Sequence, residues 1–234
     1  MSKNYLVVGG SSGIGLALTN QLASENNKVI VLSRNQNQLQ INENIEFHSI
    51  NVLDEAPSFP TIDHELNGLA YCPGSINLKP FKSLKEQDYL NDFNVNALGA
   101  VKVINKYLPN IKKADGSSIV LFSTVAVQTG MPYHASVAMA KGAVEGLTRT
   151  LAAEFAPQIR VNTIAPSLTD TPMASRLLSS DEKREASAKR HPLNSIGKPE
   201  NVAKATAYLL SDDSGWITGQ IMHIDGGISS LRLL

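Results

Sequence analysis

"VVGGSSGIGLAL", residues 7–18, places four glycines between an apolar run and a helical pattern. Gly9, Gly13 and Gly15 allow the chain to turn tightly, and they let backbone N–H groups approach a phosphate at the positive end of a helix. A second β-branched run, "KVIVLSR" (28–34), follows at the separation expected of a strand–helix–strand unit. Turns also collect glycine, but this setting favours a binding site for the pyrophosphate of a dinucleotide.

Further apolar runs continue the alternation of strand-like and helix-like segments. They lie at residues 45–50, 68–74, 117–123, 159–166 and 220–227. Helices are expected between them, at about 86–109, 136–156, 173–190 and 199–211. The alternation predicts a single-domain α/β Rossmann fold over residues 1–234, a doubly wound parallel sheet of about seven strands with helices on both faces. The connections 35–44 and 55–66 are too short or too rich in proline for full helices, so stubs or coil are expected there.

The composition excludes several classes of partner. The chain has 234 residues, 21 acidic and 21 basic side chains and a formal net charge of zero. This balance gives no electrostatic basis for binding nucleic acid or an anionic membrane. No apolar run approaches the roughly 18 residues of a membrane span, and the first strand begins too early for a signal peptide. The single cysteine, Cys72, fits a reducing compartment, so we expect a cytoplasmic protein with no nucleic-acid or membrane partner.

Several motifs, in order along almost the whole chain, resemble the short-chain dehydrogenase/reductase superfamily. The glycines match its cofactor loop, with Val8 in place of the usual threonine. "FNVNALGA" (93–100) resembles the segment that carries the family's active-site asparagine, here Asn96. The closing "WITGQIMHIDGG" (216–227) is similar to the family's last strand.

The stretch "APSLTDTPM" (165–173) resembles the family's proline–glycine turn, with Ser167 in place of the glycine. The nicotinamide-contacting threonine that follows this turn corresponds to Thr171. The resemblance therefore implies a bound nicotinamide dinucleotide and no metal. The residues expected to bind the cofactor are Gly9, Ser11, Ser12, Gly13, Ile14, Gly15, Ser33, Arg34, Asn51, Val52, Gly74, Lys141, Pro166, Leu168 and Thr171.

The end of the second strand bears on the choice of dinucleotide. It reads Ser33-Arg34-Asn35, with no acidic side chain to accept a hydrogen bond from a ribose 2′-hydroxyl. The planar guanidinium of Arg34 suits a 2′-phosphate, although arginines after strands are also common on solvated surfaces. We therefore expect NADP(H) rather than NAD(H).

In the family, acid–base chemistry is carried by a serine, a tyrosine about thirteen residues later and a lysine four residues after the tyrosine. Lys141 matches the lysine, because the following "GAVEGLTRTLAAEFAP" agrees well with the family. The serine position is then Thr124, which keeps a hydroxyl to hold a carbonyl oxygen. The tyrosine position is Val137, which has no proton to donate. Asn96 is expected to hold a water molecule that links Lys141 to solvent.

Two side chains just upstream are candidates for the missing proton donor. His134 precedes Val137 by three residues and Lys141 by seven, so a helix that begins early would place all three on one side. An imidazole is able to donate a proton near neutral pH. Tyr133 keeps the phenol but is expected in a loop. The alternatives are that both only line the pocket or the surface, and that water or a substrate group supplies the proton.

Residues 168–195 fall where the family carries a lid over its substrate, and "MASRLLSSDEKREASAKRHPL" (173–193) is polar and helical in pattern. The resemblance implies an NADP(H)-dependent oxidoreductase that interconverts a carbonyl and an alcohol in a small or medium substrate. A catalytically silent NADP(H)-binding protein, such as a redox sensor or assembly partner, and a lyase or isomerase on the same scaffold are the alternatives. A homo-oligomer, a dimer or tetramer, is expected from the resemblance.

Overall fold

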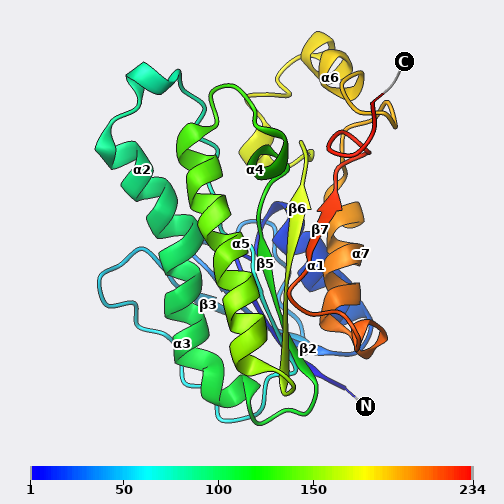
Figure 1. The fold of residues 1–234 in the computed structure, drawn as a ribbon. Helices are drawn as coiled ribbons and strands as arrows, with labels where there is room; N and C mark the ends of the chain where they lie inside the picture. Colours follow the sequence, from blue (N-terminus) through cyan, green and yellow to red (C-terminus); the bar gives the residue numbers. More distant parts are fainter. Residues whose placement is uncertain (1, 233–234) are drawn as a thin grey trace.

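Apolar, β-branched strands form the centre of the molecule. The structure, a computed structural model, describes residues 2–232. Seven parallel strands form one sheet in the order β3-β2-β1-β4-β5-β6-β7 (Figure 1). The strands are β1 (Asn4–Val8), β2 (Lys28–Ser33), β3 (Ile45–Ser49), β4 (Gly68–Tyr71), β5 (Ser117–Phe122), β6 (Ile159–Pro166) and β7 (Ile221–Ile224).

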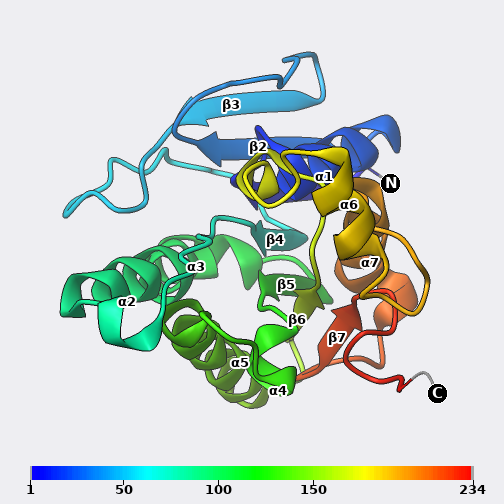
Figure 2. The ribbon, with the colours of Figure 1, turned by 90° about the horizontal axis from the view of Figure 1, so that it is seen from above.

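Helices cover both faces of the sheet. Figure 2 shows α2, α3 and α5 on one side of it and α1 and α7 on the other. The helices are α1 (Gly13–Ser24), α2 (Glu86–Phe93), α3 (Gly99–Ile111), α4 (Ala126–Thr129), α5 (Ala135–Phe155), α6 (Asp181–Ala188) and α7 (Pro199–Leu210). The predicted single-domain Rossmann architecture, a parallel sheet between two helical layers, is confirmed.

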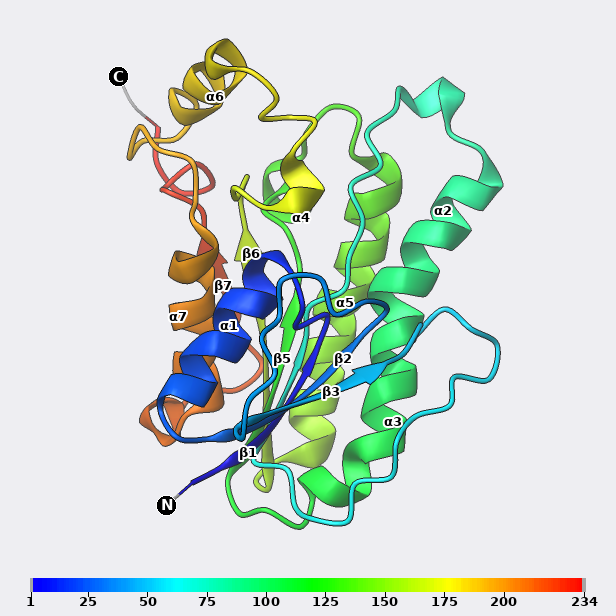
Figure 3. The same ribbon diagram turned by 180° about the vertical axis from the view of Figure 1, so that it is seen from behind.

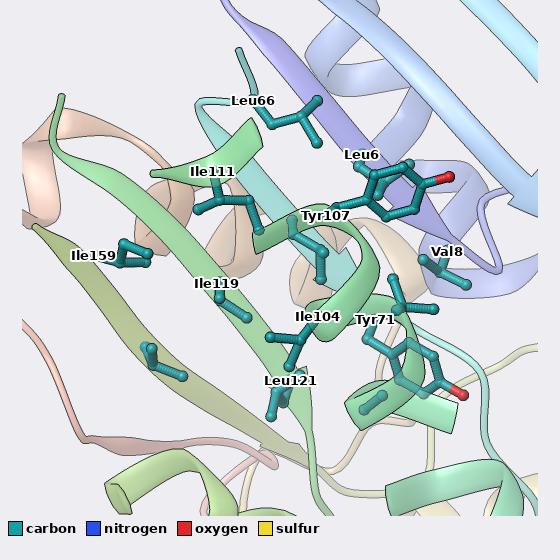
Figure 4. Close-up of a cluster of buried hydrophobic side chains, with 14 of the residues drawn as sticks. Leu6, Val8, Leu66, Tyr71, Ile104, Tyr107, Ile111, Ile119, Leu121 and Ile159 are labelled. Atoms are coloured by element: carbon teal, nitrogen blue, oxygen red, sulfur yellow. The ribbon is translucent and has the colours of Figure 1, made fainter. Parts of the chain in front are cut away.

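The sheet separates two hydrophobic clusters because successive side chains of a strand point to opposite faces. Leu6 and Val8 of β1 pack with α3 and α5, in the cluster that Figure 4 shows. Tyr5 and Val7 of the same strand pack with α1 and α7. Burying one such side chain stabilises the fold by roughly 1.5–3 kcal/mol, and this double burial explains why the strands read as continuous apolar runs.

The two connections that flank β3 are coil, as their short and proline-containing sequences predict. Residues 34–44 and 50–67 contain turns and one isolated bridge but no helix. The strand β3 pairs only with β2, so this edge of the sheet has little cover.

The expected helix over 173–190 is wrong in extent. A short 3₁₀ turn occupies Pro172–Ala174, and α6 begins only at Asp181. The side chain of Ser180 accepts a hydrogen bond from the N–H of Lys183 and so caps the helix at that point. A serine that caps a helix holds the preceding residues out of it, and those residues form turns instead.

The order of strand connections reverses at β1, which lies between β2 and β4. In open parallel sheets, ligands bind in the crevice outside the carboxyl ends of the strands at this point. The 3₁₀ turn and α6 stand above the same end of the sheet (Figures 1 and 3). Among residues 2–232, no helix combines the length and the apolar character that crossing a membrane requires.

Candidate functional site

A cavity of about 1010 Å³ lies over the carboxyl ends of the strands. The loop after β1, the ends of β2, β4, β5 and β6, the start of α5 and the lid segment all contribute to its wall. Every site residue predicted from the sequence lines this cavity except Asn96, whose side chain is buried behind the wall. Within residues 2–232, no group of three or more His, Cys, Asp or Glu side chains is placed to hold a metal ion.

The glycine loop leaves space that any larger residue would fill. A Cβ on Gly15 would overlap the carbonyl oxygen of Gly9 and lie 2.9 Å from its carbonyl carbon. Gly9 itself has φ +76°, in the left-handed region that favours glycine. Ser12 precedes α1 in extended conformation, without a side-chain cap and with no acidic residue in the first helical turn. The positive end of α1 is therefore left open toward the cavity and suits an anion such as a pyrophosphate.

Two further glycines bring distant segments together. A Cβ on Gly13 would lie 3.2 Å from the Cγ2 of Thr171, so the loop after β1 and the segment after β6 are adjacent. A Cβ on Gly74 would lie 3.3 Å from Asn96 Oδ1 and 3.5 Å from Lys141 Nζ. The bare backbone at Gly74 leaves room for a ligand to reach Lys141, and the residues present fit an extended dinucleotide.

The cavity extends to the end of β2. Arg34 is exposed there, and no carboxylate of residues 2–232 pairs with it in the structure. The side chain of Asn37 donates a hydrogen bond to Ser11 Oγ (3.0 Å) and so connects this end to the glycine loop. The Oγ of Ser33 is buried without a partner. Asn51 bonds within its own turn, to Asp54 Oδ1 at 2.7 Å.

Lys141 is the buried cation of the cavity. Its side chain is 7% exposed, and Nζ donates a hydrogen bond to the carbonyl oxygen of Phe122 at 2.7 Å. Burial lowers the pKa of the ammonium to about 8, and nearby Cys72 and Asp92 partly oppose this shift. A lysine with this pKa is charged at neutral pH and has N–H groups left to donate to a ligand.

Asn96 is positioned by an irregular helical turn. Residues Asn94–Leu98 form a π-helical turn between α2 and α3, and such turns are frequent at functional sites. The hydroxyl of Tyr71 donates to the carbonyl oxygen of Val95 (2.7 Å) inside this turn. A Cβ on Gly99 would overlap that hydroxyl, which explains the glycine.

Asn96 belongs to a hydrogen-bonded group that the sequence did not indicate. Its Nδ2 donates to Ser75 Oγ (2.9 Å) and to the carbonyl oxygen of Asp92 (2.7 Å), and its Oδ1 is buried without a partner. Ser75 in turn donates to Asp92 Oδ1 at 2.6 Å. The only sequence feature that could have indicated this group is that Asp92 precedes Asn96 by one helical turn.

The chain after β5 provides a hydroxyl, and the start of α5 provides an apolar wall. Thr124 Oγ1 accepts a hydrogen bond from the N–H of Ala126 (3.3 Å), which leaves its proton free to donate into the cavity. Val137 is 5% exposed and lines the cavity one helical turn before Lys141. Val137 itself therefore presents no donor toward the cavity.

The arrangement that would stack His134, Val137 and Lys141 on one helix is wrong, because α5 begins at Ala135. His134 precedes the helix, and its Nδ1 lies 2.7 Å from the carbonyl oxygen of Pro132. Tyr133 has φ +69°, and its side chain is 59% exposed at the mouth of the cavity. Both line the cavity, but neither is held beside Lys141 by a hydrogen bond.

Two contacts join α6 and the residues after it to the chain that follows β6. Arg184 of α6 forms a bidentate ion pair with Asp170, with distances of 2.7 and 3.1 Å. His191, which follows α6, lies with Nε2 2.8 Å from Ser167 Oγ. Sequence reasoning missed His191, because no local pattern connects residues 24 positions apart.

Comparisons with known proteins agree with this geometry. A family model described as enoyl-(acyl carrier protein) reductase matches residues 8–229. The 3-oxoacyl-[acyl-carrier-protein] reductase FabG of Thermotoga maritima is 32% identical over 97% of this chain and 97% of its own. Carbonyl reductase family member 4 of Danio rerio is also 32% identical, over 99% of this chain and 100% of its own.

Solved structures show the same fold. The ligand-free aldohexose dehydrogenase of Thermoplasma acidophilum has a TM-score of 0.88 and 26% identity, covering 100% of this chain and 96% of its own. ElxO with NADP bound has a TM-score of 0.85 and 27% identity, covering 99% and 100%. Sequence relatives, family model and fold agree, and the chain belongs to the oxidoreductases of the short-chain dehydrogenase/reductase superfamily.

Proposed function

We propose that this protein is an NADP(H)-dependent oxidoreductase that interconverts a carbonyl and an alcohol in a small or medium substrate. The observation that carries the proposal is the single cavity in which the glycine loop, Lys141, Thr124 and Thr171 meet. The bound nicotinamide would supply or accept the hydride. The remaining chemistry, which is binding, orientation and proton transfer, belongs to the residues of the chain.

Each of these residues has a separate task in the proposed reaction. The N–H groups of the first turn of α1 would bind the pyrophosphate, and Lys141 would donate to the nicotinamide ribose. The hydroxyl of Thr124 would hold the carbonyl oxygen while negative charge develops on it. The lid, fastened by Arg184 to Asp170, would exclude water from the reacting end. Val137 stands where the family carries its tyrosine, so the proton must come from another group.

Val137 also favours a second candidate function, an NADP(H)-binding protein without turnover. A redox sensor or assembly partner needs the glycine loop and Lys141 but no proton donor. Thr124 and the lid segment argue against this alternative, because a binder has no use for a carbonyl-holding hydroxyl or a water-excluding segment.

The deciding experiment measures NADPH consumption by its near-ultraviolet absorbance against a broad panel of aldehydes, ketones and diketones. Lys141→Met is measured beside the wild type to expose contaminating reductases. Turnover that disappears in this variant is the expected result. A wild-type protein that NADPH protects against heat, but that consumes it with no compound of the panel, contradicts the oxidoreductase and favours the silent binder.

The proposed preference for NADP(H) makes a separate prediction about Arg34. A hydrogen bond to a charged group contributes about 1.5–3 kcal/mol, so Arg34→Ala is expected to weaken NADPH binding by roughly 10- to 100-fold. NADH lacks the 2′-phosphate, and its affinity is expected to change by less than about twofold. Fluorescence titration of both nucleotides tests this, with Arg149→Ala, an exposed arginine outside the cavity, as the matched control. Equal losses for NADPH and NADH contradict the assignment.

A further inference from the structure

The cavity contains a hydroxyl that is polarised by a buried imidazole. Ser167 follows β6, lines the cavity, and has its Oγ 2.8 Å from Nε2 of His191. The His191 side chain also lines the cavity, although the residue is only 3% exposed. This pair is the one place in the cavity wall, among the described residues, where a histidine ring contacts a hydroxyl.

The hydrogen bonds of His191 fix which ring nitrogen carries the proton. Nδ1 lies 2.8 Å from the carbonyl oxygen of Ser187, which only accepts, so Nδ1 must donate. In the neutral ring, Nε2 therefore carries no proton and accepts a hydrogen bond from the hydroxyl of Ser167. When the ring gains a second proton, Nε2–H must donate to Ser167 Oγ, and the serine proton turns away from the ring toward the cavity. The pair thus has two states, and in the protonated state Ser167 is a donor.

Ser167 stands at the reacting end of the cavity. The N–H of Val125 donates to the carbonyl oxygen of Pro166 (3.2 Å), so the extensions of β5 and β6 that carry Thr124 and Ser167 run side by side. Leu168, which is expected to bind the cofactor, follows Ser167 directly, and Thr171, which is expected to contact the nicotinamide, lies four residues after it. The hydroxyl is therefore beside the position where hydride transfer takes place in the proposed function.

The imidazole is held from three sides. Ser167 on the extension of β6 and Ser187 on α6 bind its two nitrogens. Gly226, in the turn after β7, packs against it so closely that a Cβ there would lie 3.3 Å from His191 Cβ. A ring fixed in this way keeps its orientation while it exchanges a proton.

The charged side chains within three residues of Ser167, Ser187, His191 or Gly226 all have hydrogen-bond or ion-pair partners. They are Asp170, Arg184, Glu185, Lys189, Arg190 and Asp225, and His223 of β7 is the other titratable side chain in these stretches. Arg184 pairs with Asp170 and Lys189 with Glu185, and Arg190 donates to Ser187 Oγ. The carboxylate of Asp225 accepts from the N–H of Gly227 and from Ser229. Among the described residues, no carboxylate forms a hydrogen bond or ion pair with the ring, so Ser167 is the hydrogen-bond partner of Nε2.

We propose that Ser167 is the catalytic proton donor of this protein and that His191 is the positioning residue that reprotonates it, in place of a tyrosine. This inference rests on the proposed oxidoreductase function and deepens it. In the reducing direction the carbonyl carbon gains the hydride, the carbonyl oxygen takes the proton of Ser167 Oγ, and Ser167 Oγ takes the proton of His191 Nε2. The carbonyl becomes an alcohol, the cofactor is oxidised, and the ring returns to its neutral form. Once the product has left, a proton from solvent reaches Ser167 Oγ, and the proton of Ser167 passes to His191 Nε2.

The first test compares reduction rates of Ser167→Ala and His191→Gln with the wild type across pH. A general acid contributes about 10²- to 10⁴-fold, so Ser167→Ala is expected to lower kcat by at least about 100-fold while its NADPH affinity stays within about twofold. Glutamine can hydrogen-bond but does not titrate, so His191→Gln is expected to lower kcat and to remove one ionisation from the pH profile. The exposed Ser58→Ala and His64→Gln, both outside the cavity, are the matched controls.

The second test needs neither cofactor nor turnover. Long-range proton–nitrogen NMR of the five ¹⁵N-labelled histidines, with His191→Gln for assignment, reports the tautomer of His191. The neutral ring is expected to carry its proton on Nδ1, because Nδ1 lies beside the carbonyl oxygen of Ser187. A neutral ring protonated on Nε2 overturns the relay, whatever the rates are.

The outcomes separate this inference from the proposed function. A wild type that reduces a carbonyl while Ser167→Ala retains its rate and pH profile overturns the relay and leaves the oxidoreductase standing. A large loss in Tyr133→Phe or His134→Phe, with Ser167→Ala unaffected, assigns the donor to that side chain instead. A wild type that binds NADPH but reduces nothing overturns the proposed function and the relay with it.

Discussion

Gly15→Ala is expected to abolish NADPH binding and to destabilise the fold. The added Cβ would overlap the carbonyl oxygen of Gly9 and lie 3.1 Å from the Cα of Gly10, and all these contacts are with backbone. Backbone cannot rotate aside as a flexible side chain does, so the loop must open and α1 must shift. In the proposed function these same N–H groups bind the phosphates, so we expect at least about a 100-fold loss of NADPH affinity, roughly 3 kcal/mol. Fluorescence titration and thermal unfolding measure the two effects.

Gly146→Ala is the matched control for this prediction. Gly146 lies within α5, and a Cβ there would meet nothing within 4 Å. Alanine stabilises an exposed helix position by up to about 1 kcal/mol relative to glycine, so this variant is expected to bind NADPH normally and to unfold slightly later. If Gly15→Ala binds NADPH within threefold of the wild type, the glycine loop is not the phosphate site.

Lys141→Met is expected to stabilise the protein without cofactor and to remove its response to NADPH. Burial lowers the lysine pKa from 10.5 to about 8. One pKa unit corresponds to about 1.4 kcal/mol, so keeping this buried ammonium charged at pH 7 costs the folded state about 3 kcal/mol. The variant also loses the hydrogen bond to Phe122, worth about 1 kcal/mol. The net gain is about 2 kcal/mol, or about 4–8 °C in Tm for a chain of this size.

The sign of the pH dependence follows from proton linkage. Between pH 8 and 10.5, the unfolded chain holds a proton on this lysine that the folded chain has released, so wild-type stability rises with pH through that window. The advantage of Lys141→Met is therefore full below pH 8 and disappears toward pH 10.5. Thermal unfolding at pH 7, 9 and 10, with and without NADPH, checks both parts. A variant that is less stable than the wild type at pH 7 contradicts the buried-charge explanation.

The architecture was predictable because one physical signal is strong. Strands that are buried on both faces must be apolar along their whole length, and β5 and β6 read that way without ambiguity. Connections too short for helices were also recognisable. The first residue of α6 was not predictable. The residues between Met173 and Ser180 are compatible with helix, and the capping contact of Ser180 with the N–H of Lys183 makes the helix begin only after them.

The cavity was predictable where function leaves a local pattern and unpredictable where it depends on contacts across the fold. Glycines at the β1–α1 junction and Lys141 within α5 belong to continuous motifs. The sequence indicated Ser167 only as a replacement for the family's glycine, and no pattern in it indicated His191. Their contact arises when the lid returns over the end of β6, and no spacing rule describes that path.

The coil on both sides of β3 has a consequence for the order of events in binding. Local unfolding starts where few apolar contacts hold the backbone, and β3 hydrogen-bonds to a single neighbouring strand. The same coil carries Asn37, Asn51 and Val52, which line the cavity. In the proposed function, a dinucleotide would contact this weakly held coil as well as the glycine loop. Part of its binding free energy would then become local folding free energy, so a rising cofactor concentration would order this edge of the sheet.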